Sequence, residues 1–261
     1  MLCVISPAKR LDWSDTHVVQ STPEFEEDAI SLAKTMRRLP LRDIKSLMKL
    51  SDDLAQLNRD RFQAFDPSPD MDNTRPAAFA FAGDTYVGLD ARNLSEEDID
   101  YAQDHLRILS GLYGVLRPKD AIQPYRLEMG TRLKTRRGQS LYAYWKDAPA
   151  KALNAQAASI DTDIVVNCAS QEYFGAIDRK ALIPRVVTPS FQEIKAGAPK
   201  TIGFFAKKAR GAMARYLVQN RVTDLSKMLE FDVDGYAYDP ELSKPDTPVF
   251  TRAYRTASKS T

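Results

Sequence analysis

The chain has 261 residues, 43% of them hydrophobic, which is the usual share for a globular protein with a buried core. Its net charge of +2 is uninformative as a total. No apolar run approaches the roughly 20 residues that a membrane-spanning helix needs, and the start, MLCVISPAKR, becomes charged too early for a signal peptide. We therefore expect a compact protein that stays in the cytoplasm.

The first third of the chain predicts one strand, three helices and a hairpin. A buried strand is expected at residues 2–5, and it ends at the polar loop Ser6-Pro7-Ala8-Lys9. Residues 22–57 show helical spacing with breaks at proline and serine, which predicts three short helices. Residues 66–76 predict a surface loop, and 77–82 with 85–89 predict a β-hairpin.

The middle of the chain predicts a helix followed by a glycine turn. Ser95 with Asp98 marks a helix start, and apolar residues at helical spacing extend the predicted helix to residue 110. Gly111 and Gly114 then predict a turn, and Pro118 predicts the start of another short helix. This is the outline of a helix-hairpin-helix, whose glycine amides can approach a nucleic-acid phosphate. A helix C-cap with a tight connection explains the same glycines, so both interpretations stay open.

The second half predicts the rest of a mixed sheet. Its elements are a helix at 140–158 interrupted near Pro149, strands at 163–169, 185–194 and 201–206, a helix at 206–220, and edge strands at 235–238 and 248–255. The helix at 206–220 has one apolar face and cations on the rest of its circumference. The predicted fold class is α+β: a single compact domain over 1–255, with a mixed β-sheet flanked by helices, and a mobile tail at 256–261.

Chemistry through a bound group has little support in the sequence. Cys3 and Cys168 lie in apolar runs without a partner at metal or redox spacing, which predicts buried, reduced thiols. With two histidines and no His or Cys pair at ligand spacing, we expect no metal site. A P-loop and a GxGxxG motif after a strand are both missing from the sequence, so we expect no cofactor.

Positive charge is concentrated in two windows. Residues 117–137 hold seven basic and two acidic residues, and residues 200–221 hold six basic residues and no acid. Such asymmetry suits a confined site for an anion, although solvated helix faces produce the same pattern.

A further group of candidates lies where predicted strands end. If these ends converge, they form a cationic pocket that binds a phosphate or performs acid/base chemistry. Glu172, Tyr173 and Lys9 are the catalytic candidates, although an ion pair with a lysine explains Glu172 equally well. The group consists of Ser6, Lys9, Asn167, Ser170, Glu172, Tyr173, Lys207, Lys208 and Arg210.

Five stretches carry a resemblance to a known family. They are ISPAKRLD at 5–12, LMKLSDDLAQLN at 47–58, HLRILSGLYGVLRPKDAIQPYRLEMG at 105–130, NCASQEYF at 167–174 and FFAKKARGAMARYL at 204–217. Over nearly its whole length the chain resembles the YaaA family of bacterial peroxide-stress proteins. The resemblance implies a cytoplasmic protein that protects against hydrogen peroxide, apparently by keeping unincorporated iron low and limiting Fenton damage. It also implies a distinctive α/β fold, a helix-hairpin-helix, a positively charged cleft and binding of double-stranded DNA.

Two functional hypotheses follow. The first is a peroxide-stress protein that binds double-stranded DNA through phosphates without reading bases. The rival is an enzyme that acts on a small anionic or nucleotide-like substrate in the strand-end pocket. The candidate phosphate-binding residues are Ser6, Lys9, Gly111, Gly114, Arg117, Lys119, Arg126, Ser170, Lys207, Lys208, Arg210 and Arg215.

Overall fold

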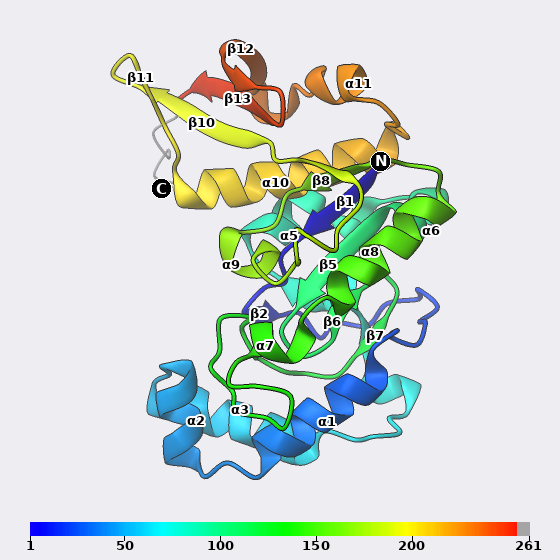
Figure 1. Ribbon diagram of the computed structural model, residues 1–261, viewed down its shortest axis with the longest axis vertical. Helices are drawn as coiled ribbons and strands as arrows, with labels where there is room; N and C mark the ends of the chain where they lie inside the picture. Colours follow the sequence, from blue (N-terminus) through cyan, green and yellow to red (C-terminus); the bar gives the residue numbers. More distant parts are fainter. Residues whose placement is uncertain (255–261) are drawn as a thin grey trace.

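A five-stranded sheet forms the centre of the structure, a computed structural model that describes residues 1–254 (Figure 1). In spatial order its strands are β6 (Gly114–Leu116), β5 (Leu106–Ser110), β1 (Leu2–Ile5), β8 (Ile164–Asn167) and β9 (Arg185–Val187). β1 pairs in parallel with β5 on one side and with β8 on the other, and only β6 runs antiparallel to its neighbour. Every residue of β1 is buried, which agrees with its uninterrupted apolar sequence.

A second sheet of four strands lies beside the first, at the top of Figure 1. Its order is β11 (Ala198–Lys200), β10 (Ser190–Lys195), β13 (Thr247–Ala253) and β12 (Ala237–Lys244). Two short ladders complete the strands: β2 (Arg10–Leu11) with β4 (Phe81–Ala82), and β3 (Arg75–Pro76) with β7 (Ala121–Ile122).

The long helix α10 (Gly203–Gln219) joins the two sheets, because it contacts both β1 and β10. Helices α1 (Glu26–Arg37), α2 (Leu41–Met48) and α3 (Asp52–Ala64) lie together at the bottom of Figure 1, away from α10. The other helices are α4 (Ala77–Ala80), α5 (Asp84–Leu89), α6 (Glu96–His105), α7 (Leu141–Trp145), α8 (Ala148–Ser159), α9 (Gln171–Phe174) and α11 (Leu225–Leu229). Short 3-10 turns occupy Met71–Asn73, Ala91–Asn93 and Val233–Gly235.

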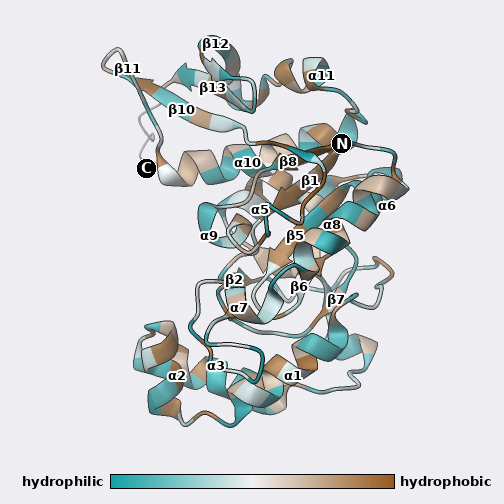
Figure 2. Ribbon diagram, in the orientation of Figure 1, coloured by the Kyte–Doolittle hydropathy of each residue, from teal (hydrophilic) through white to brown (hydrophobic). Residues whose placement is uncertain are grey.

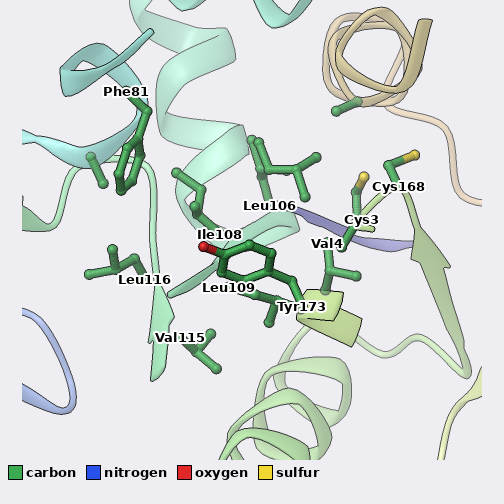
Figure 3. Packing of buried hydrophobic residues seen from close by; sticks show 14 of the residues in the cluster. Cys3, Val4, Phe81, Leu106, Ile108, Leu109, Val115, Leu116, Cys168 and Tyr173 are labelled. Atoms are coloured by element: carbon green, nitrogen blue, oxygen red, sulfur yellow. The ribbon is translucent and has the colours of Figure 1, made fainter. Parts of the chain in front are cut away.

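One cluster of buried hydrophobic residues extends from Met1 to Phe250. Figure 2 shows hydrophobic residues concentrated on the central strands, and Figure 3 shows the side chains that pack there. Cys3 and Cys168 are both buried and both free, which confirms the prediction of unbridged thiols. The hydrogen bond with Cys168, together with burial, raises the pKa of the Cys3 thiol, so this thiol stays protonated.

The predicted helix-hairpin-helix is wrong. Ser95 does cap α6, accepting a hydrogen bond from the backbone N–H of Asp98 at 3.1 Å, but the helix ends at His105. Residues 106–110 form the strand β5, which is buried along its whole length, and the glycine turn leads directly into β6. The helix was predicted wrongly because an apolar run that is buried on both faces has no hydrophobic periodicity by which a helix can be distinguished from a strand. Pro118 lies in a turn and starts no helix.

Other boundaries also differ from the predictions. The expected hairpin at 77–89 is two short helices, α4 and α5, on either side of β4. The expected strand at 201–206 is the start of α10, and the segment 185–194 is divided between the two sheets. β13 lies inside its sheet and is not an edge strand. The tail predicted at 256–261 lies outside the described residues.

Several elements confirm the sequence analysis. They are the strands predicted at 2–5 and 163–169, the three helices of the first third, the helix at 206–220, and the break near Pro149, which stands in the first turn of α8. The α+β class with mixed sheets flanked by helices is confirmed as well.

The β5–β6 turn gives a test of the fold. Gly114 has a φ of +66°, and a Cβ atom there would lie 2.8 Å from Cζ3 of Trp145. Gly114→Ala should therefore lower the free energy of unfolding by roughly 2–4 kcal/mol, from backbone strain plus overpacking. Gly197→Ala is the matched control, since Gly197 has a φ of +76° but nothing within 4 Å. Thermal or denaturant unfolding measures the loss. If both variants lose the same free energy of unfolding, overpacking against Trp145 does not contribute to the cost of Gly114→Ala.

Candidate functional site

The carboxyl ends of β1 and β8 meet, as the sequence analysis expected. These strands are neighbours, and the hydroxyl of Ser6, just after β1, donates to that of Ser170, just after β8, at 3.3 Å. The backbone N–H of Ser170 donates to the Ser6 hydroxyl at 2.9 Å, and the Ser170 hydroxyl caps α9. The chain leaves β1 for β5 on one side and later returns to β8 on the other, and such a reversal opens a crevice at the strand ends.

A cavity of about 400 Å³ occupies this crevice. Its walls come from the loop after β1, the start of α5, the loop before Gly130, α9 and the first turns of α10. Of the predicted strand-end group, the cavity gathers Ser6, Lys9, Ser170, Glu172, Tyr173, Lys207 and Arg210. Sequence reasoning missed Arg10, Asp84, Thr85, Tyr86 and Glu128, which also line it.

The charged groups of the cavity differ in how they are paired. Lys9 forms an ion pair with Glu128 at 2.7 Å, whereas Arg10 and Lys207 have no acidic partner among the described residues. Arg210 donates from its Nε to the carbonyl of Ala206 at 3.3 Å, which leaves its terminal nitrogens available. Burial lowers the pKa of Arg210, yet an arginine remains charged at neutral pH.

Two carboxylates of the cavity, those of Glu172 and Asp84, form no ion pair within residues 1–254. Glu172 does not pair with a lysine within residues 1–254; its Oε1 accepts the backbone N–H of Gly130 at 2.9 Å. The second oxygen of Glu172 and the carboxylate of Asp84 have no hydrogen-bond partner in the described part of the chain. The cavity therefore offers both cations and acceptors.

The two tyrosines of the cavity wall are both buried. Tyr86 donates its hydroxyl to the carbonyl of Ser6 at 3.1 Å, and burial raises its pKa well above the ordinary value. Burial also raises the pKa of Tyr173, whose ring packs among Val4, Ile108 and Leu109 (Figure 3). Neither phenol ionises near neutral pH, so the geometry does not favour Tyr173 as a general base.

Two glycines set the distance between the cavity walls. A Cβ atom on Gly88 of α5 would lie 2.0 Å from the carbonyl oxygen of Lys208, and one on Gly211 of α10 would lie 1.8 Å from that of Thr85. The backbones of α5 and α10 are therefore in direct contact, which brings Lys207 and Arg210 opposite the start of α5.

The remaining predicted cations of the 200–221 window lie elsewhere. Lys208, next to Lys207, points away and pairs with Asp234 at 2.8 Å. Arg215 pairs with Asp90 at 3.0 Å and donates to three backbone carbonyls, one in the last residue of α5 and two after it. The face predicted to be wholly cationic is thus largely neutralised by acids from distant segments.

The basic residues of the 117–137 window and the glycine turn also lie outside the cavity. Arg117 pairs with the buried Asp120 at 2.8 Å, and Lys119 pairs with Asp100. Arg126 lies 3.2 Å from Glu128, a residue of the cavity wall. Gly111 and Gly114 are buried, so a ligand on the surface does not reach their amides. Asn167 is directed to the Thr188 hydroxyl at 3.3 Å.

The close contact of α5 and α10 can be tested with a matched pair of variants. Gly211→Ala forces the two backbones apart and should cost roughly 3 kcal/mol of unfolding free energy. Gly203→Ala, in the same helix with nothing within 4 Å, should leave the melting temperature unchanged or slightly higher. A Gly211→Ala protein as stable as the parent would show that the contact does not fix the cavity walls.

Residues 1–254 lack two other kinds of feature. In this part of the chain no helix is long and apolar enough to cross a membrane. No three His, Cys, Asp or Glu side chains within it are grouped so that they could hold a metal ion.

Comparisons with known proteins identify the family. Residues 1–242 match the family model described as peroxide stress protein YaaA. A UPF0246 protein of Ruegeria pomeroyi is 66% identical over 98% of this chain and 100% of its own length. UPF0246 proteins of Roseobacter denitrificans and Caulobacter vibrioides are 64% and 52% identical, each over 97% of this chain and 99% of the relative. The chain therefore belongs to the YaaA family of peroxide stress proteins, also called UPF0246.

Proposed function

We propose that this peroxide stress protein binds double-stranded DNA through its phosphates, using the cationic rim of the strand-end cavity. The rim consists of Lys9, Arg10, Lys207 and Arg210. The observation that carries the proposal is that Arg10 and Lys207 face the cavity without an acidic partner in the described structure, while seven of the thirteen cations of the two basic windows are paired with a carboxylate there.

Unpaired cations are the groups that a phosphate backbone attracts. A lysine or arginine already paired with a carboxylate gains little from a phosphate, because the two anions compete for it. Binding that releases counterions from the backbone depends on salt and not on base sequence. The proposed complex is therefore not specific for base sequence. Contacts between the rim cations and the phosphates position the protein on the duplex.

Two further parts of the proposal come from the family resemblance. We infer that the protein acts in the cytoplasm, and that it helps to keep unincorporated iron low, so that less hydroxyl radical forms near the bound DNA. Both parts are separate from phosphate binding and are measured separately, by fractionation and by the level of chelatable iron in peroxide-treated cells.

An enzyme acting on a small anionic substrate is the alternative function. The concave shape of the cavity favours it, as does the second oxygen of Glu172, which has no hydrogen-bond partner in the described part of the chain. Catalysis of that kind would depend on the Glu172 carboxylate as an acid or base, whereas phosphate binding at the rim does not require it.

Neighbouring lysines on α10 provide the test of duplex binding. Contact with about three phosphates, one for each rim cation without an acidic partner in the described structure, predicts that log affinity falls with log salt at a slope near −2.7. Lys207→Ala should weaken binding to any duplex and reduce the slope by about 1, because one phosphate contact is lost. Lys208→Ala is the matched control, since Lys208 pairs with Asp234 away from the cavity, and it should leave both quantities unchanged.

The measurement is fluorescence anisotropy with a random duplex at several salt concentrations. Absence of binding at low salt would refute the proposed function. Equal effects of the two substitutions would mean that the cavity rim has no particular role in binding.

A further inference from the structure

The cavity is larger and chemically more varied than a phosphate site requires. Its volume of about 400 Å³ lies at the lower end of the range for small-molecule sites, which is roughly 300–1,000 Å³. A backbone phosphate needs only the cations of the rim. The space beneath the rim is therefore available to a ligand of several more atoms.

The carboxylates indicate what kind of ligand fits. Asp84 and Glu172 lie in the same cavity as Arg10 and Lys207, and like charge makes both carboxylates unfavourable neighbours of a bare phosphate. Carboxylate oxygens do accept hydrogen bonds from the exocyclic amino groups of bases. A ligand with an anionic end and an amino-bearing end, such as a nucleotide, matches both sets of groups.

An exposed aromatic residue precedes the cavity-lining Lys207 by one helical turn on α10. Phe204 is 53% exposed, although most large apolar side chains of this chain are buried. It precedes Lys207 by three residues on α10, so the two side chains are neighbours about one helical turn apart. An apolar side chain in this position is suited to enter a base stack, as wedge residues do in proteins that distort DNA.

We propose that the cavity receives a single nucleotide turned out of the bound duplex, and that Phe204 occupies the space left in the stack. The inference rests on the proposed duplex binding. Arg10 and Lys207 hold the phosphates on either side of the turned-out nucleotide, and Glu172 with Asp84 accepts hydrogen bonds from its base. A mismatched nucleotide is preferred, because less pairing energy opposes its extrusion.

The experiment uses a duplex that carries 2-aminopurine opposite a mismatch. The fluorescence of this base increases when it leaves the stack, and anisotropy of an end label reports binding on the same sample. We expect a several-fold rise in fluorescence at saturating protein, larger for the mismatched than for the fully paired duplex. In Ala8→Phe, which fills the cavity from its wall, and in Phe204→Ala, the rise should be lost while the duplex stays bound.

Ile183→Ala serves as the control, because Ile183 is 84% exposed and is not among the cavity-lining residues. Tight binding without a rise in fluorescence would overturn the inference and leave the proposed function standing, whereas absence of binding would refute the proposed function itself. A rise that persists in both Ala8→Phe and Phe204→Ala would also overturn it. Free deoxycytidine monophosphate should suppress the rise without displacing the duplex; full displacement would show a site for free nucleotides instead.

Discussion

The direct contact between α5 and α10 determines the geometry of the candidate site. Gly88 and Gly211 leave no room for a side chain at the crossing, so the two helices touch through their backbones. Because α10 also packs against β1 and β10, this contact fixes the relative positions of three parts of the site. They are the loop after β1, the start of α5 and the basic turns of α10. A looser crossing would separate Lys207 and Arg210 from Asp84, and the cavity would lose one of its walls.

Ion pairs decide which cations are available to a ligand. Arg221 and Arg215 are held by Asp98 and Asp90, and Arg117 is held by Asp120. The first two pairs join α10 and the turn after it to α6 and the end of α5, whereas the Arg117–Asp120 pair lies within the segment after β6. Within residues 1–254, the cations without an acidic partner include Arg10, Lys207 and Arg210 at the cavity, and also Arg132, Lys134 and Arg136 outside it. The first three differ from the others because they line one cavity, where they can attract an anion together.

The sequence predicted the parts of the fold that have a clear pattern. A short apolar run with a polar end predicts the strand at 2–5, and an amphipathic pattern predicts the helix at 206–220. The structure confirms both predictions. The segment 106–110 was taken for helix because its apolar residues also fit helical spacing, and only pairing with β1 decides the outcome. The helix α5 was missed because Tyr86 and Val87 have strand propensity, which the contact with α10 overrides.

The site was predictable where it depends on strand ends and not where it depends on loops. Adjacent parallel strands bring Ser6 and Ser170 together, and this follows from the order of two recognisable strands. Arg10 follows Lys9, which is a predicted site residue, and its charge alone makes it a candidate for the same site. Asp84 and Glu128 enter the cavity through a helix and a loop whose positions no local pattern reveals. Conversely, the acids that neutralise Lys208 and Arg215 come from distant segments, so charge windows in the sequence overstate the cationic surface.

Chemical footprinting of lysines by acetylation and mass spectrometry, with and without a random duplex, tests whether DNA binds at the rim of the cavity. The account predicts that bound duplex slows acetylation of Lys9 and Lys207 at the cavity, while Lys49 after α2 and Lys151 on α8 react as before, because all four are exposed in the free protein. Protection of Lys49 or Lys151, with Lys9 and Lys207 still fully reactive in the complex, would place the DNA on another surface and contradict the account.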